Sequence, residues 1–196
     1  MRLTPAKRIL AAAAFVLSTA AVAATADIVE GNPDATVKVL IYSDLQCDYC
    51  QSFRTILDEK LLPKYGKQVA FVHRDFPLPR HKWAREAAMA ARWVWEQNPR
   101  AGVVLRRELL AEQEHITEAS LKPWLIQFAD RNKLSEKDIV AAMTDTRLGA
   151  LVDSDIQAAT VRGIKTVPTV IVAGKTFSET IVYDNVAQAI DQALPH

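Results

Sequence analysis

Short, continuously apolar runs and longer stretches with helical periodicity follow one another along the chain. The run at residues 37–42 is apolar and rich in β-branched side chains, which predicts a buried central strand. Apolar residues between Phe53 and Leu62 recur at intervals of 3, 1, 4 and 1, which predicts an amphipathic helix. We expect this helix to begin at the two cysteines that precede it and to end near Pro63.

The remaining pattern predicts a second strand, a block of helices, a hairpin and a final helix. The second strand covers residues 68–76, and from residue 81 to about residue 162 the periodicity is helical throughout. We expect five helices in that block, at residues 81–97, 103–114, 118–131, 135–144 and 149–162, with Ser135 as an N-cap. Two strands joined at Gly174 follow over residues 164–177, and a short helix covers residues 184–194.

Residues 1–26 differ in character from the rest of the chain. Basic residues precede an apolar run at residues 9–17, and an alanine-rich stretch follows. This order is typical of a cleavable signal peptide, so we expect residues 27–196 to form the mature, exported protein. The alternative is an uncleaved membrane anchor, but Ser18 and Thr19 interrupt the apolar run.

Length, charge and glycine content narrow the possible functions. The 196 residues are enough for about one domain. With 24 Lys and Arg against 23 Asp and Glu, the formal charge is +1, so neither sign is in excess for binding nucleic acid or an anionic membrane. The six glycines are scattered and form no phosphate-binding loop. We therefore expect no nucleic-acid partner and no cofactor.

The chain has two cysteines, Cys47 and Cys50, separated by Asp48 and Tyr49. A structural disulfide across so short a loop would contribute only about 2 kcal/mol through loop-closure entropy. A zinc site would need four ligands, and the sequence has no second cysteine pair to supply them. A Cu(I) site made of the two thiolates is left open. We favour thiol–disulfide exchange, because export places the pair in an oxidising compartment.

The predicted local structure gives the two sulfurs different tasks. We expect Cys47 at the N-terminus of its helix with the sulfur exposed, where unpaired backbone N–H groups stabilise a thiolate. Cys50 lies one turn later and is expected to face inward. An accessible attacking thiol with a sheltered resolving thiol is the arrangement that thiol–disulfide exchange requires.

Three motifs follow one another along the chain. They are residues 37–53 with Cys-Asp-Tyr-Cys, residues 71–78 followed by His81 and an alanine-rich helix, and residues 166–169, Thr-Val-Pro-Thr, which lead to Gly174-Lys175. In this order they resemble the DsbA family of periplasmic thiol:disulfide oxidoreductases. The resemblance covers nearly all of the predicted mature chain.

The resemblance implies an α/β thioredoxin fold with an inserted all-helical subdomain at approximately residues 81–162. It also implies that Cys47 attacks, that Cys50 resolves the mixed disulfide, and that Pro168 is a cis-proline beside the disulfide. With a cis bond, the backbone of Val167 would be free to pair with an extended substrate peptide.

The residues between and around the cysteines depart from the family pattern. Asp48 and Tyr49 stand where the strong oxidants of the family resemble Cys-Pro-His-Cys, and Val167 stands where many relatives have Thr. We assign Asp48, Tyr49 and Val167 to redox tuning and to the substrate groove. A carboxylate at Asp48 should repel the Cys47 thiolate and keep its pKa at about 7, at the thioredoxin end of the range. The chain should therefore be a weaker oxidant than the strongest members of the family.

For a few other polar or buried positions the sequence predicts a structural environment and no catalytic role, apart from a possible buried acid. Ile41 stands six residues before Cys47, where relatives often bury an acid, and Glu59 is a candidate to replace that acid. We expect His73 to be a half-buried residue with a satisfied hydrogen bond. Arg106 and its neighbour Arg107 are expected on a solvated face.

These observations predict an exported oxidase that donates its Cys47–Cys50 disulfide to folding exported proteins with cysteines and is re-oxidised by a membrane redox partner. A disulfide reductase, an isomerase and a Cu(I)-binding dithiol module are the alternatives. Dimeric isomerases of the wider superfamily carry an N-terminal dimerisation domain, but only residues 27–46 precede Cys47 in the predicted mature chain. We therefore expect a monomer.

Overall fold

A five-stranded sheet forms the centre of the computed structural model, which describes residues 27–195, so the predicted signal peptide lies outside the described residues. The strand order is β1-β3-β2-β4-β5, in which β2 and β3 are parallel and the other neighbours antiparallel. The strands are β1 Ile28–Gly31, β2 Val37–Ser43, β3 Val69–Asp75, β4 Thr169–Val172 and β5 Lys175–Ser178. The apolar run after residue 36 is thus the central strand, as its composition predicts.

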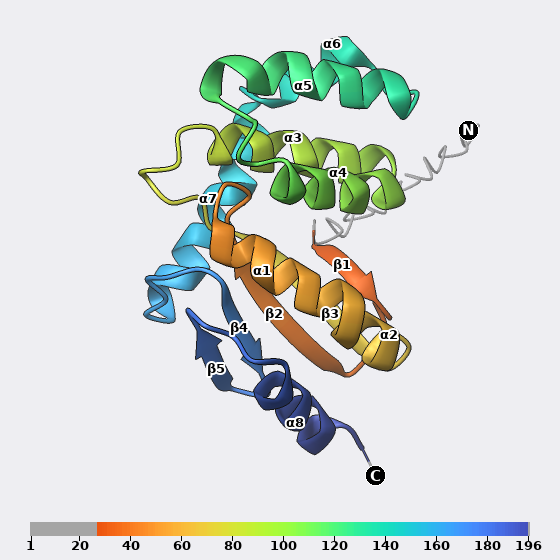
Figure 1. The fold of residues 1–196 in the computed structure, drawn as a ribbon, viewed down its shortest axis with the longest axis vertical. Helices are drawn as coiled ribbons and strands as arrows, with labels where there is room; N and C mark the ends of the chain where they lie inside the picture. The colour runs from red at the N-terminus through yellow and green to blue at the C-terminus, as the bar shows by residue number, and fades with distance from the viewer. Residues whose placement is uncertain (1–26, 196) are drawn as a thin grey trace, which may run out of the picture.

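The two faces of the sheet are covered by different parts of the chain (Figure 1). One face packs against a continuous helical segment, α1 Asp48–Ile56, η1 Leu57–Leu61 and α2 Leu62–Tyr65, and against α8 Tyr183–Ala193. Because side chains alternate along a strand, Val39 and Ile41 join that core, whereas Tyr42 joins the core of the inserted helices. The π-helical turn η1 is a feature that the apolar spacing does not predict.

Five helices lie between β3 and β4 and form the upper half of the molecule in Figure 1. They are α3 Ala84–Gln97, α4 Pro99–Ala111, α5 Glu118–Arg131, α6 Glu136–Ala142 and α7 Thr146–Val161. The fourth of them, α6, is capped by Ser135 as predicted, and α7 packs against β3. The α/β fold with an all-helical insertion that the family resemblance implies is therefore present.

Several boundaries differ from the prediction because capping residues decide them. Helix α4 begins four residues earlier than expected, since the side chain of Asn98 accepts a hydrogen bond from the Ala101 N–H at 3.2 Å and Pro99 suits the first turn. Helix α7 begins three residues earlier, because Asp145 accepts from the Leu148 N–H at 3.0 Å. Strand β1 was not predicted, because it is a four-residue edge strand with little apolar pattern of its own.

Buried ion pairs hold the inserted helices to the end of β3. The carboxylate of Asp75 accepts hydrogen bonds from Arg92 of α3 and from Arg106 of α4, each at 2.7 Å. Arg92 also pairs with Asp155 of α7, and the second carboxylate oxygen of Asp155 bonds Arg74 at 3.0 Å. The expectation of a solvated Arg106 is wrong: its side chain is only 4% exposed, because Asp75 gives it a buried counter-ion.

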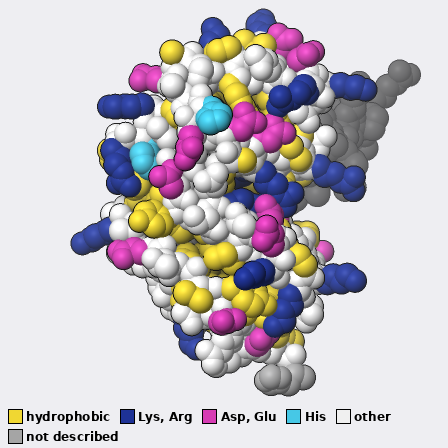
Figure 2. Space-filling model, in the orientation of Figure 1, with side chains coloured by type: hydrophobic (Ala, Val, Ile, Leu, Met, Phe, Trp, Pro, Cys, Tyr) yellow, Lys and Arg dark blue, Asp and Glu magenta, His cyan; other side chains and the backbone are white. Residues whose placement is uncertain are grey.

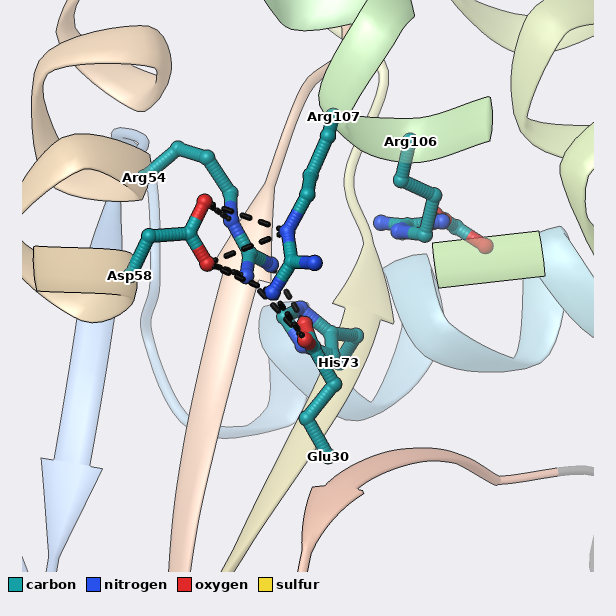
Figure 3. A network of polar contacts seen from close by, with 7 residues as sticks. Glu30, Arg54, Asp58, His73, Arg106 and Arg107 are labelled. Atoms are coloured by element: carbon teal, nitrogen blue, oxygen red, sulfur yellow. Dashed lines mark hydrogen bonds and ion pairs between the residues drawn. The ribbon is translucent and has the colours of Figure 1, made fainter. Parts of the chain in front are cut away.

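A second polar network joins β1, α1, η1, β3 and α4 (Figure 3). The buried carboxylate of Glu30 contacts Arg54, the Nε2 of His73 at 2.9 Å and Arg107 at 3.0 Å, and Asp58 pairs with both arginines. His73 is fully buried rather than half-buried, but its expected hydrogen bond is present. Arg107 is partly exposed, in keeping with the expected solvated face, and it is also ion-paired.

Replacing Asp75 by Asn should lower the free energy of unfolding by about 3–5 kcal/mol, because it removes the charge that the buried guanidinium groups of Arg92 and Arg106 share. The matched control is Arg147→Met, which breaks an exposed ion pair with Glu96 and should cost less than about 1 kcal/mol. Urea unfolding of both variants measures the difference. Equal losses would contradict a structural role for the buried pairs.

Candidate active site

The two cysteines lie where the chain turns from the central strand β2 into α1. Cys47 is the N-cap residue of α1, with extended backbone angles (φ −108°, ψ 122°), and its carbonyl accepts from the N–H groups of Cys50 and Gln51 at 2.9 and 3.1 Å. The N–H of Cys47 in turn donates to the Asp44 carbonyl at 3.3 Å. The prediction that the helix begins at the cysteines is confirmed.

Both cysteines are free thiols, and both are buried. Cys50 is 2% exposed, as expected for the inward-facing residue. Cys47 is 4% exposed, so the expectation of an exposed sulfur is wrong. The reason is a loop distant in sequence: the thiol of Cys47 donates to the carbonyl of Val167 at 3.8 Å, and Val167 precedes Pro168 through a cis peptide bond.

The surroundings of the two sulfurs shift their pKa values in opposite directions. A hydrogen bond from the Cys50 thiol, with the N–H groups of Cys50 and Tyr49, lowers the pKa of Cys47 to about 6, although burial and the charge of Asp44 act against this shift. Burial raises the pKa of Cys50 far above its ordinary value, and the hydrogen bond to Cys47 raises it further. Cys47 therefore carries the thiolate at neutral pH, and Cys50 keeps its proton.

Asp44 is the site residue that sequence reasoning missed. Its side chain is fully buried and accepts hydrogen bonds from the N–H groups of Gln46 and Leu78, both at 2.7 Å. A third contact joins it to the Nδ1 of His81 at 2.8 Å. A carboxylate directly after a buried strand and three residues before Cys47 was the available signal. Glu59, the candidate considered instead, is exposed on η1.

A surface cavity of about 270 Å³ opens beside the cysteines. Tyr49 and Val167 line it together with Leu78, Arg80, Lys165 and others, so the structure brings together two of the three residues expected at the substrate groove. Tyr49 is 64% exposed. Asp48, the third, is exposed on the first turn of α1 and is not among the lining residues of this cavity.

On the face drawn in Figure 2, Lys and Arg side chains are interspersed with Asp and Glu, in keeping with the balanced charge of the chain. Among residues 27–195, no group of three or more His, Cys, Asp or Glu side chains could hold a metal ion. Within the same range, no helix is long and apolar enough to cross a membrane.

A family model described as Thioredoxin matches residues 23–192, which include both cysteines and Pro168. The chain belongs to the thioredoxin family. Among curated relatives, it is 23% identical over 170 residues to Disulfide bond formation protein D of Bacillus subtilis, covering 84% of this chain and 75% of that protein. It is also 31% identical over 150 residues to the Na(+)/H(+) antiporter NhaA 3 of Salinispora tropica, covering 76% of this chain. The matched part is 22% of that antiporter, so the chain spans less than a quarter of this relative.

Several solved structures share this fold. BdbD from Bacillus subtilis superposes with a TM-score of 0.77 at 22% identity, covering 86% of this chain and 92% of that one. The thiol-disulfide exchange protein α-DsbA2 from Wolbachia pipientis gives 0.71 at 17% identity, covering 85% and 86%. The family match and these structures agree on a thioredoxin-like fold, in which the chain carries the Cys-x-x-Cys pair at the start of α1.

The ultraviolet absorbance of the thiolate in the dithiol form should rise with pH around a midpoint of about 6, which reports Cys47. Cys47→Ser should abolish this step. Cys50→Ala should move it upward, because it removes the thiol that donates to the Cys47 sulfur. A wild-type midpoint at the ordinary thiol value of about 8.5 would show that the helix N-terminus and Cys50 do not stabilise the charge.

Proposed function

We propose that this thioredoxin family member is an exported oxidase that transfers its Cys47–Cys50 disulfide to dithiols of folding proteins. The supporting observation is the unequal pair of sulfurs. Cys47 ionises readily and faces the Val167 carbonyl, whereas Cys50 is buried and keeps its proton. Because the Cys47 thiol is acidic, its thiolate is a good leaving group when the client disulfide forms. Because the pKa of Cys50 is high, its thiolate takes up a proton readily once the Cys47–Cys50 bond has broken.

The exchange proceeds in two displacements. A client thiolate attacks the Sγ of Cys47, the Cys47–Cys50 bond breaks, and the sulfur of Cys50 leaves with the electron pair and takes up a proton. A second client thiolate then attacks the client sulfur of the mixed disulfide, which forms the client disulfide and releases Cys47 as a thiolate. The client loses two electrons and the Cys47–Cys50 pair gains them.

An extended client segment would lie in the cavity beside the cysteines. Tyr49 and Val167 border this cavity, and the carbonyl of Val167, directly before Pro168, lies 3.8 Å from the Sγ of Cys47. Client backbone would pair along Val167 in the manner of an added strand. Asp48, exposed at the start of α1, would act on the Cys47 thiolate through its charge alone.

The remaining features of the proposal follow from the sequence. The basic, apolar and alanine-rich order of residues 1–26 supports export to the periplasm through a cleavable signal peptide. The clients would be unfolded or folding exported proteins with cysteines, and a membrane redox partner would re-oxidise the dithiol. The chain would act as a monomer, without cofactor or nucleic acid.

An oxidase should form disulfides in a reduced, unfolded ribonuclease and should have a redox potential above that of thioredoxin in equilibrium with glutathione, that is, above about −270 mV. The same samples should be tested for reduction of insulin and for rearrangement of a scrambled ribonuclease. Faster reduction or rearrangement than oxidation would replace the proposal by a reductase or an isomerase. Stoichiometric, tight Cu(I) binding without dithiol oxidation would replace it by a copper-binding module.

Single cysteine variants separate the two roles. In the reverse direction, the Cys47 thiolate attacks a client disulfide, one client sulfur leaves as a thiolate, and Cys50 resolves the mixed disulfide. Cys50→Ala should therefore accumulate mixed disulfides with a disulfide-bonded client, and Cys47→Ser should form none. Non-reducing electrophoresis of each reduced variant after incubation with the disulfide-bonded client measures the trapped species. Equal trapping by both variants would contradict the assignment of Cys47 as the attacking thiol.

A further inference from the structure

Two carboxylates lie within three residues of Cys47, but their surroundings differ. Asp48 is exposed on the first turn of α1. The side chain of Asp44 has no exposed surface and lies between the end of β2 and the start of α1. Burial raises the pKa of Asp44, and the hydrogen bonds from the N–H groups of Leu78 and Gln46 act against this shift. The ionised carboxylate of Asp44 is screened less by water and salt than that of Asp48, so it acts more strongly on nearby groups.

The buried carboxylate joins two segments of the chain. One oxygen accepts from the N–H of Gln46, directly before Cys47, at 2.7 Å. The other accepts from the N–H of Leu78 at 2.7 Å and contacts the Nδ1 of His81 at 2.8 Å. Asp44 therefore ties the turn that carries Cys47 to the segment between β3 and α3.

Asp44 also acts on each sulfur, and in opposite senses. Its backbone N–H donates to the Sγ of Cys50 at 3.4 Å, which favours negative charge on the sulfur that leaves in the first displacement. Its carboxylate charge opposes the Cys47 thiolate, whose pKa the hydrogen bond from Cys50 lowers. Of the carboxylates near the site, Asp44 has the largest such effect on Cys47.

We propose that Asp44 is the positioning residue that sets the redox balance of the Cys47–Cys50 pair: it fixes the turn that carries Cys47, orients Cys50 through its N–H and holds a buried negative charge against the Cys47 thiolate. The disulfide form has no thiolate to repel. Asp44 thus favours the disulfide over the dithiol and makes the pair a weaker oxidant than it would be without this charge. The inference deepens the proposed oxidase function and rests on it for its biological meaning.

The reaction that measures this balance is the equilibrium of the protein disulfide with two molecules of glutathione, which yields the protein dithiol and one glutathione disulfide. Asp44→Asn should shift the equilibrium constant toward the dithiol by about tenfold, equivalent to a rise of about 30 mV in the potential for two electrons. The Cys47 thiolate absorbance should report a lower pKa in the same variant.

Two matched variants separate charge from geometry. Asp48→Asn removes an exposed carboxylate adjacent to Cys47 and should shift the equilibrium by less than about threefold, because solvent screens it. His81→Asn retains a donor near the Nδ1 position and leaves the charge of Asp44 in place, so its shift should also be below about threefold. A shift in Asp48→Asn as large as that in Asp44→Asn would overturn the proposal, as would an unchanged or more reducing Asp44→Asn.

Asn accepts hydrogen bonds through one oxygen only, so Asp44→Asn could unfold. Asp44→Ser is the second charge-removing variant, because a serine hydroxyl can still accept from the Gln46 N–H. Both variants should shift the potential in the same direction, and circular dichroism should confirm that they fold. Opposite shifts would overturn the charge argument. Because glutathione needs no client, failure of wild-type protein to oxidise ribonuclease would reject the oxidase function without altering this comparison.

Discussion

The carboxylate of Asp75 at the end of β3 fixes the position of the inserted helices relative to the sheet. It lies between the guanidinium groups of Arg92 and Arg106, which come from α3 and α4, and the neighbouring carboxylate of Asp155 brings in α7. Each of these charges is costly to bury alone, so the arrangement is stable only when all partners are present. The sheet and the helical insertion are therefore joined by directional contacts as well as by apolar packing.

The position of the helices in turn shapes the cysteine site. The segment between β3 and α3 leaves the sheet next to Asp75 and presents Leu78 and His81 to the carboxylate of Asp44. The backbone N–H of Trp83, the N-cap residue of α3, donates to the side-chain oxygen of Gln46 at 3.1 Å. The turn that precedes Cys47 is thus held by groups whose place depends on the inserted helices, which connects the stability of the insertion to the geometry of the sulfurs.

Local signals predicted much of this structure. The apolar run of β2, the periodic helix after the cysteines and α5, whose bounds match the expected residues 118–131, follow from patterns within one segment. The start of α4 was also readable, because Asn98 followed by proline is a cap signal, although periodicity alone placed it too late. Strand β1 has no such signal, since an edge strand of four residues is specified by its partner β3.

The parts of the site that were not predicted depend on contacts between distant segments. The burial of the Cys47 sulfur requires Val167, which lies 120 residues away in sequence. The role of Asp44 requires His81 from the segment after β3, and the burial of Arg106 requires Asp75. A charged residue at one position looks the same in the sequence whether it meets water or a buried counter-ion, so only the assembled fold distinguishes these cases.

The two edge strands of the sheet determine how readily unfolded chains can add to it. The edge strands β1 and β5 are each four residues long, and β1 directs the charged side chain of Glu30 inward, into the network with Arg54 and His73. Short edge strands and inward-pointing charges both hinder the addition of a foreign strand to a sheet. The sheet of this protein thus resists aggregation with the folding chains that the proposed exchange reaction would bring to its cysteines.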